Sequence, residues 1–157
     1  MKNNVAASIG NLALIEKVDG EHKFFERVFG GLGGKAKNLV PSTKLFIYNR
    51  LGECFATNRL REGYSPELFD LLKFTRIPSE RSFYRDLERL GKKSPFILEQ
   101  YQKFIREEGL VADKQFMDFS SSYFEGKAQA WGEFGYSRDG QPGKKQLTFG
   151  VCTGING

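Results

Sequence analysis

Side chains that bind metals are scarce in this sequence. Its 157 residues include one histidine, His22, and two cysteines, Cys54 and Cys152, which are too far apart to form a C-x-x-C pair. A zinc site assembled from closely spaced cysteines and histidines is therefore not expected. Two isolated cysteines are typical of the reducing cytosol, and we expect both to be buried free thiols rather than partners in a disulfide.

Long apolar runs are also lacking. No stretch approaches the roughly 20 apolar residues that span a bilayer. Asn11 and Glu16 interrupt the apolar start of the chain, and no small-residue cleavage pattern follows it, so residues 1–18 do not read as a signal peptide. We therefore expect a cytoplasmic protein that has no membrane as a partner.

The composition indicates a folded protein with a basic surface. Hydrophobic residues make up 39% of the chain and aromatic residues 14%, so a core is expected and global disorder is not. The formal net charge is +5. A basic balance favours an anionic partner, with nucleic acid first and an acidic membrane surface second.

Helical patterns begin early in the chain. Residues 1–20 give no assignment, whereas the apolar spacing after Asp19 predicts a helix over residues 19–30. A second helix is predicted from residue 42 or 43 to about residue 60. Its apolar face would contain Ile47, Leu51, Cys54 and Phe55.

Three further helices are marked by serine and proline. A serine followed by a proline predicts helix starts at residues 65–66 and 94–95. The first of these helices must end before Pro78. A capping serine then precedes a helix over residues 80–90, and the helix that starts at 94–95 ends at Gly109.

The periodicity changes after Ala112. Residues 114–123 read as an extended segment, residues 139–140 are an Asp-Gly turn signal, and residues 145–153 alternate between apolar and polar side chains. The chain then closes with Asn-Gly, a hairpin turn signal that no returning strand follows. Because two strands alone are marginal in water, we expect a chain that is truncated within a domain.

Basic residues form a stripe on the predicted helix over residues 80–90. At 100° per residue, this stripe lies opposite an apolar face made by Phe83, Leu87 and Leu90. A short helix followed by an arginine-striped helix resembles a helix-turn-helix reader, and arginine forks bind phosphates or guanine edges. The alternative is a solvated helix face on which neighbouring carboxylates pair with the arginines. The stripe consists of Arg81, Arg85 and Arg89.

A single carboxylate, Asp118, interrupts the first predicted strand. It stands among apolar and small residues in the segment 116–126, which reads FMDFSSSYFEG. A charged group in such a strand is costly unless it binds something, and a metal cation would be an adequate partner. The alternative is a solvent-facing position, because strand alternation places Asp118 opposite Met117 and Phe119.

Two longer strings carry a family resemblance. They are DFSSSYFEG at residues 118–126 and FGYSRDGQPGKKQL at 134–147, the latter leading into a strand that ends at Thr153. This region is similar to the start of the catalytic domain of prokaryotic insertion-sequence DDE transposases. The upstream string YNRL at 48–51 and the helices up to Gly109 also resemble that family.

The resemblance implies a ribonuclease-H-like catalytic domain in which Asp118 is the first catalytic carboxylate and a ligand of Mg²⁺ or Mn²⁺. Two such ions would clamp the attacking and leaving oxygens of a phosphoryl transfer. The family's second aspartate and final glutamate are absent up to Gly157, so this chain alone is not expected to cleave or join DNA. The resemblance also implies contacts with the DNA backbone from a basic, aromatic loop. That loop contains Tyr136, Arg138, Lys144 and Lys145.

We therefore expect an α+β protein. Residues 1–112 would be mostly helical and bind DNA, and residues 113–157 would be the first antiparallel strands of an incomplete ribonuclease-H-like domain. The expected function is that of a DDE transposase, present as an N-terminal portion that binds insertion-sequence ends. The alternatives are a stand-alone DNA-binding regulator derived from a transposase, and a relic without function. A second copy of the chain is a further candidate partner.

Overall fold

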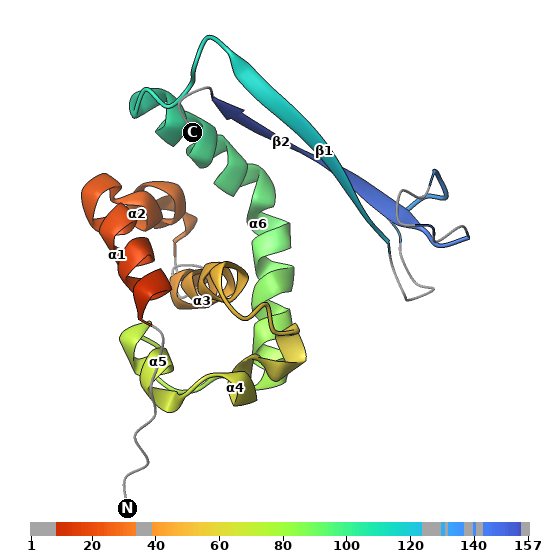
Figure 1. Cartoon of the computed structure of the whole chain (residues 1–157). Helices are drawn as coiled ribbons and strands as arrows, with labels where there is room; N and C mark the ends of the chain where they lie inside the picture. Colours follow the sequence, from red (N-terminus) through yellow and green to blue (C-terminus); the bar gives the residue numbers. More distant parts are fainter. Residues whose placement is uncertain are drawn as a thin grey trace, which may run out of the picture. The chain divides into compact units, whose positions relative to one another are not determined.

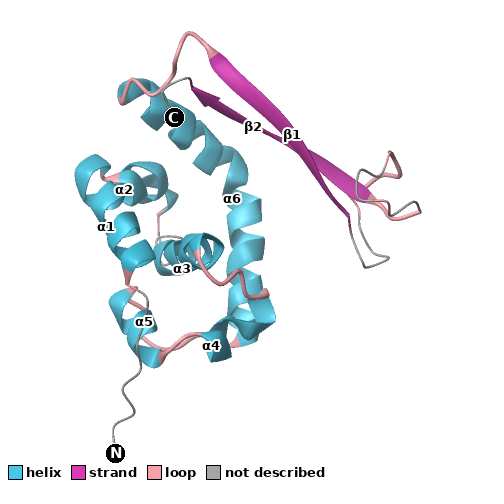
Figure 2. Cartoon of the chain, viewed as in Figure 1, coloured by secondary structure: helices cyan, strands magenta, loops and turns pink. Residues whose placement is uncertain are grey.

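Helices form the first part of the chain and a two-stranded sheet forms the second (Figure 1; Figure 2). The computed structural model describes residues 9–33, 39–123, 130, 132–136, 140 and 143–154. The chain divides into two compact units, a helical unit that ends at Ile105 and a hairpin unit that begins at Arg106. The α+β class expected from the sequence is confirmed.

The helical unit contains six α-helices and two short 3-10 helices among its described residues, the last α-helix running two residues past Ile105. They are α1 (Gly10–His22), α2 (Phe24–Phe29), η1 (Gly30–Leu32), α3 (Leu39–Leu51), η3 (Thr57–Arg59), α4 (Leu60–Gly63), α5 (Pro66–Leu71) and α6 (Glu80–Glu107). Figure 1 shows α6 along one side of this unit, with α3 between α1 and α6. Two side-chain contacts hold this order, because Lys44 of α3 bonds to Glu16 of α1 and Ser42 of α3 bonds to Asp86 of α6.

The predicted helix over residues 19–30 is divided in two. Lys23 adopts a left-handed conformation with φ of 51°, and its N–H bonds to the carbonyl of Asp19, which ends α1. The backbone N–H of Phe25 then bonds to the Asp19 carboxylate at 3.0 Å. Asp19 therefore stabilises both the end of α1 and the first turn of α2, and this local hydrogen bonding outweighs a continuous apolar pattern.

The predicted helix from residue 42 or 43 to about 60 was wrong at both ends. The helix α3 begins at Leu39 and ends at Leu51, after which Cys54 adopts a positive φ of 53°. The predicted apolar face was wrong too, because Leu51 and Cys54 are exposed. The residues of α3 that are buried are Leu39, Ser42, Leu45, Tyr48 and Asn49.

The helix α6 is continuous, so the two separate helices predicted on either side of residues 94–95 were wrong. Pro95 lies inside α6 and removes one helical hydrogen bond, at a cost of about 3 kcal/mol. An apolar stripe with a spacing of seven residues crosses this point and packs on the core of the helical unit. The stripe consists of Phe83, Leu90, Ile97 and Phe104. Its burial outweighs the local effect of the proline.

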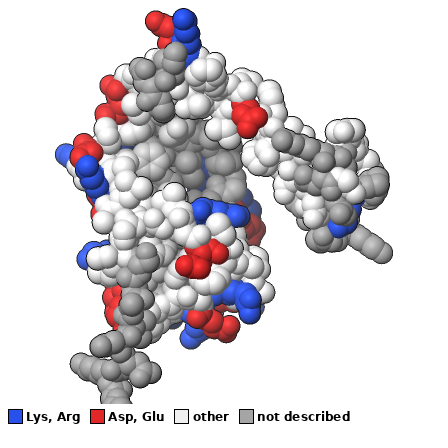
Figure 3. Space-filling view, viewed as in Figure 1, with Lys and Arg blue, Asp and Glu red and all other residues white. Residues whose placement is uncertain are grey.

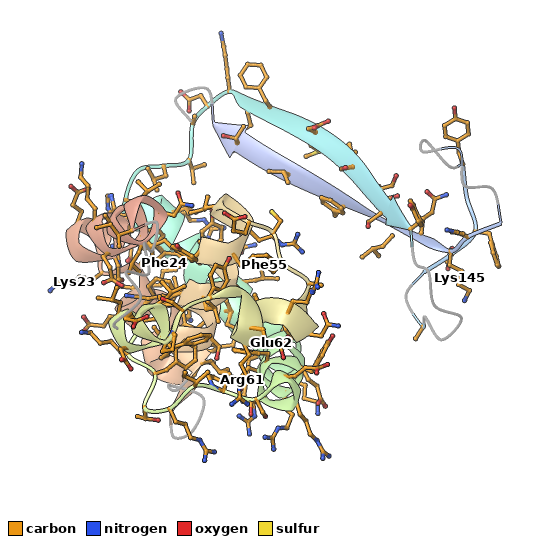
Figure 4. All side chains as sticks on the ribbon, turned by 60° about the horizontal axis from the view of Figure 1, so that its bottom comes forward. Lys23, Phe24, Phe55, Arg61, Glu62 and Lys145 are labelled. Carbon is orange, nitrogen blue, oxygen red and sulfur yellow. The ribbon has the colours of Figure 1, made fainter. Side chains whose placement is uncertain are left out.

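Aromatic side chains dominate the core of the helical unit. Phe24 makes edge contacts with Phe25 and Phe104, at ring-centroid distances of 5.1 and 5.3 Å. Phe69 stacks on Phe83 at 6.5 Å, which joins α5 to α6. The stick view places Phe24 and Phe55 among the side chains of this unit (Figure 4). The contact between Phe69 and Phe83 fixes the start of α6, where the arginine stripe lies.

The hairpin unit contains two antiparallel strands, as predicted. The strands are β1 (Gln115–Tyr123) and β2 (Gln146–Gly154), and they pair with Asp118 opposite Val151. Large apolar side chains are exposed on both faces of this ribbon, including Phe116 and Phe149 on one face and Met117 and Phe119 on the other. A sheet of this composition requires cover on both faces to bury its side chains.

The two cysteines are free, as expected, but the prediction that they are buried was wrong. Cys54 lies in the exposed turn after α3, and Cys152 lies on the open hairpin. Among the helices in the described part of the chain, none combines the length and apolar character needed to cross a membrane.

Candidate nucleic-acid interface

The arginine stripe lies on the first turns of α6, and a serine cap fixes where that helix begins. The hydroxyl of Ser79 accepts a hydrogen bond from the backbone N–H of Ser82 at 3.3 Å, and the two hydroxyls lie 2.9 Å apart. The predicted cap at this position is therefore confirmed. The cap therefore fixes the directions around the axis of α6 in which the three arginine side chains project.

Two of the three arginines line a common hollow. Arg85 and Arg89 surround a pocket of about 310 Å³ together with Arg76, which comes from the segment between α5 and α6. We call this hollow the arginine pocket. Its other lining residues are Leu39, Ser42, Phe74, Thr75, Pro78, Ser82 and Asp86. Three guanidinium groups around one open pocket make it a candidate site for an anion.

Hydrogen bonds within α6 orient the arginines of this pocket. A guanidinium nitrogen of Arg85 donates to the Ser82 hydroxyl at 3.4 Å, and one of Arg89 donates to the Asp86 carboxylate at 3.2 Å. The other oxygen of Asp86 accepts a hydrogen bond from Ser42 at 2.7 Å. Asp86 therefore holds α3 to α6 and positions Arg89. It also brings one negative charge to the pocket.

Basic side chains of α6 also pair with carboxylates of the same helix, as the alternative of a solvated helix face predicts. Besides the Asp86–Arg89 pair, Lys92 bonds to Glu88 one turn away. Exposed pairs of this kind contribute little to stability. They neutralise part of the positive charge of α6, so the arginine pocket is less basic than the sequence count indicates.

Arg81 lies apart from the other two members of the stripe. It lines a second hollow, of about 600 Å³, with Arg61 of α4 and Tyr84. Figure 4 labels Arg61 and its neighbour Glu62 on the same helix. The three arginines follow each other at 40° steps around α6, so Arg81 and Arg89 come to face different hollows.

The geometry before α6 differs from that of a helix-turn-helix motif. The helix α5 has six residues, and the eight residues 72–79 separate it from α6. The turn of a helix-turn-helix is about 3–4 residues long. Lys73 in this connection adopts a positive φ of 65°. Arg76, three residues later, lines the arginine pocket. The connection therefore adds an arginine to the surface rather than forming a tight turn.

Asp118 lies in the middle of β1 and is exposed. Its face of the ribbon also carries Phe116, Ser120 and Val151, whereas Met117 lies on the other face. Within the described residues no three His, Cys, Asp or Glu side chains lie close enough to hold a metal ion together. One exposed carboxylate does not by itself fit a site for two Mg²⁺ or Mn²⁺ ions.

Three residues of the basic, aromatic loop, Tyr136, Lys144 and Lys145, belong to the part of the chain that the structure describes. Tyr136 is 92% exposed, and its carbonyl accepts a hydrogen bond from the side chain of Gln146 at 2.8 Å. Lys144 lies over the ring of Tyr123, with its nitrogen 4.6 Å from the ring centroid. Lys145 is half-buried and lies on the hairpin unit (Figure 4). Arg138 lies outside the described residues.

Positive charge is not segregated on the visible face of the helical unit. Lys and Arg are intermingled there with Asp and Glu (Figure 3). Net charge alone therefore does not define an interface on this face. The arginine pocket is defined by local convergence of side chains, and its Arg76 belongs to a segment, residues 73–93, that carries seven basic and three acidic side chains. Its Ser42 contact, made across 44 positions of the chain, had no sequence signal.

Comparisons of the chain with protein-family models, with curated proteins and with solved structures found no match.

Proposed function

We propose that this chain binds DNA through its helical unit, as the N-terminal portion of a DDE-type transposase. The observation that carries the DNA-binding part is the arginine pocket, in which Arg76, Arg85 and Arg89 converge from two segments. A guanidinium group offers several N–H donors in one plane, which suits the oxygens of a phosphate. The formal net charge of +5 adds a long-range attraction to the same polyanion.

The pocket suits the phosphate backbone better than the edge of a base. Ser82 and Asp86 each occupy one nitrogen of a neighbouring arginine, which fixes the orientation of the guanidinium and leaves its other N–H groups for a ligand. Contacts with phosphates position a protein on DNA without reading sequence. Any sequence preference would therefore come from other groups, among which Arg81 is the nearest candidate.

The transposase part of the proposal rests on the resemblance of residues 118–126 and 134–147 to that family. The apolar side chains on both faces of the β1–β2 ribbon are consistent with a sheet covered on both sides, as in a ribonuclease-H-like domain. In that domain Asp118 would be the first catalytic carboxylate. DNA binding without strand cleavage, as in a regulator, is the second candidate, because Asp118 has no companion ligands among the described residues.

The test is a titration of the purified full chain against labelled duplex DNA at several salt concentrations. One duplex carries the inverted repeats that flank the gene, and the other is scrambled. The double variant Arg85→Ala/Arg89→Ala is expected to weaken binding about tenfold or more and to reduce the salt slope by about 1–2.

The control variant removes the same charge elsewhere. Lys17 of α1 and Arg50 of α3 are exposed and lie outside the arginine pocket. If Lys17→Ala/Arg50→Ala weakens binding as much as the pocket variant does, only bulk charge is at work and the proposed interface is wrong. Preference for the inverted repeats over scrambled DNA supports a transposase or regulator, whereas equal binding favours a relic.

A further inference from the structure

A second apolar stripe runs along α6 beside the stripe that packs on the core, and Tyr101 at its end also makes an edge contact with Phe24 of α2 at 6.4 Å. Tyr84, Leu87, Leu98 and Tyr101 are exposed by 49%, 39%, 57% and 43%. At 100° per residue, this stripe is centred roughly 80° around the helix from the core stripe. Leu87, which the sequence assigned to the core face, thus lies at the edge of a separate exposed surface.

The stripe has the spacing of a coiled-coil seam. Positions 84, 87, 91, 94, 98 and 101 are separated alternately by three and four residues, as are the a and d positions of heptads. Their residues read Tyr, Leu, Gly, Ser, Leu, Tyr, an order that is nearly the same in both directions. We call these six residues the α6 seam.

This symmetry matches an antiparallel pair of identical helices. If two copies of α6 align with a two-fold axis between Lys92 and Lys93, each a position comes level with a d position of the other copy. Tyrosine then meets tyrosine, leucine meets leucine, and the two small residues meet at the centre. A parallel pair would also bring tyrosine to tyrosine and leucine to leucine, so the distribution of charge along α6 decides between the two orientations.

The central glycine has no role in the packing of its own chain. A Cβ atom added to Gly91 would meet nothing within 4 Å, and the backbone there is helical. A glycine inside a helix is unfavourable by about 1 kcal/mol relative to alanine. Close approach of a second helix gives such a glycine a packing role, since small residues let two helix backbones come near each other.

The charges of α6 favour the same orientation. Residues 80–93 carry five basic and three acidic side chains, whereas residues 94–107 carry two of each. A parallel pair would place the two basic halves together, and an antiparallel pair separates them. Lys92 and Lys93 lie beside the axis, and the ion pair of Lys92 with Glu88 offsets one of these charges.

We propose that the α6 seam binds a second copy of this chain in antiparallel orientation and forms a two-fold symmetric dimer. The surface is self-complementary in size and in register, which argues for a second copy as its occupant, and the separation of the two basic halves argues for the antiparallel orientation. The proposal does not depend on DNA binding, and its test requires no DNA.

The first test measures the mass of the full chain by sedimentation from about 1 to 500 μM, a range suited to weak association. The wild-type chain is expected to form a dimer, and Leu98→Glu to raise its Kd roughly a hundredfold, since two leucines of each dimer are replaced by carboxylates. The control is Leu71→Glu, which changes a leucine of α5 exposed by 46%. A wild-type monomer throughout, or equal effects of both variants, overturns the proposal.

The second test fixes the register by cross-linking in a background in which Cys54 and Cys152 are serine. The double variant Leu87→Cys/Leu98→Cys is expected to form a covalent dimer on oxidation. Leu87→Cys alone is not, because the two copies of residue 87 would lie roughly 16 Å apart along the helix. Efficient cross-linking of the single variant would show a parallel pair and refute the proposed register. Circular dichroism checks that each variant keeps its helices.

Discussion

Asn49 is the polar residue on which the turn after α3 depends. It is 5% exposed, and its side-chain nitrogen donates to the carbonyl of Phe55 at 2.9 Å. Its side-chain oxygen accepts hydrogen bonds from the backbone N–H of Phe55 at 2.9 Å and from the hydroxyl of Tyr64 at 2.7 Å. One amide thus joins α3 to the turn and to Tyr64, the residue just after α4.

We expect Asn49→Leu to destabilise the helical unit by about 2–4 kcal/mol. The change keeps the branched shape and the number of heavy atoms of the side chain but removes three hydrogen bonds, each of which contributes about 0.5–1.5 kcal/mol. For a unit of this size, that loss corresponds to a fall in Tm of roughly 10–25 °C. The measurement is urea and thermal unfolding followed by circular dichroism. Asn58→Leu, at an exposed position of η3, serves as the control and is expected to stay within about 0.5 kcal/mol of wild type.

The same bond network predicts a dependence on pH. Burial raises the pKa of Tyr64 from 10.0 to about 12, with smaller contributions from Tyr48, Glu53 and Cys54. The neutral phenol is therefore favoured in the folded state. Its contribution to the free energy of unfolding is complete below pH 10 and is lost as the pH rises to about 12.

A double-mutant cycle gives the decisive result. Tyr64→Phe should be costly in the wild-type background and nearly neutral beside Asn49→Leu, because the two residues share a hydrogen bond. Full additivity of the two changes, or a loss below about 1 kcal/mol for Asn49→Leu, would refute the reasoning.

Two further predictions concern contacts within the helical unit. Lys44→Met should destabilise the helical unit by about 1–2 kcal/mol at neutral pH, because Lys44 bonds to Glu16 at 2.7 Å and to Asp19 at 3.0 Å. Burial lowers the pKa of Lys44, but these bonds raise it more, so the stabilisation is present below pH 10.5 and disappears at higher pH. Gly63→Ala should cost about 1 kcal/mol, because its Cβ would come within 2.7 Å of the Phe55 ring.

Urea unfolding checks both predictions. For Lys44→Met, an unchanged free energy of unfolding at pH 7 would show that the ion pairs contribute nothing. For Gly63→Ala the control is Gly20→Ala in α1, where an added Cβ meets nothing within 4 Å. That control should stabilise the unit by about 0.5–1 kcal/mol. Equal effects of the two alanines would contradict the predicted clash.

The sequence predicted those parts of the fold that depend on local signals. The change of periodicity after Ala112 predicted β1 and the alternation over residues 145–153 predicted β2, each to within a residue, and Ser79 marked the start of α6. The continuity of α6 through Pro95 was missed because it depends on burial against other helices. The break at Lys23 was missed because a left-handed lysine leaves no pattern in the spacing of apolar residues.

The candidate site was predictable in its residue type and not in its arrangement. Arg85 and Arg89 were identified from their spacing on one helix, but Arg76 joins them only through the path of the connection before α6. The bond between Ser42 and Asp86 depends on how α3 packs on α6. Asp118 was placed correctly on β1, and its proposed catalytic role stays a prediction.

The positions of the arginine pocket and the α6 seam around the helix have a consequence for how a dimer would meet DNA. Arg85 and Arg89 lie roughly 150–190° around α6 from the middle of the seam, so a two-fold axis there would place the two pockets on opposite outer sides of the dimer. One straight duplex could not fill both pockets at once. A dimer built in this way would therefore hold two separate DNA segments, one at each pocket.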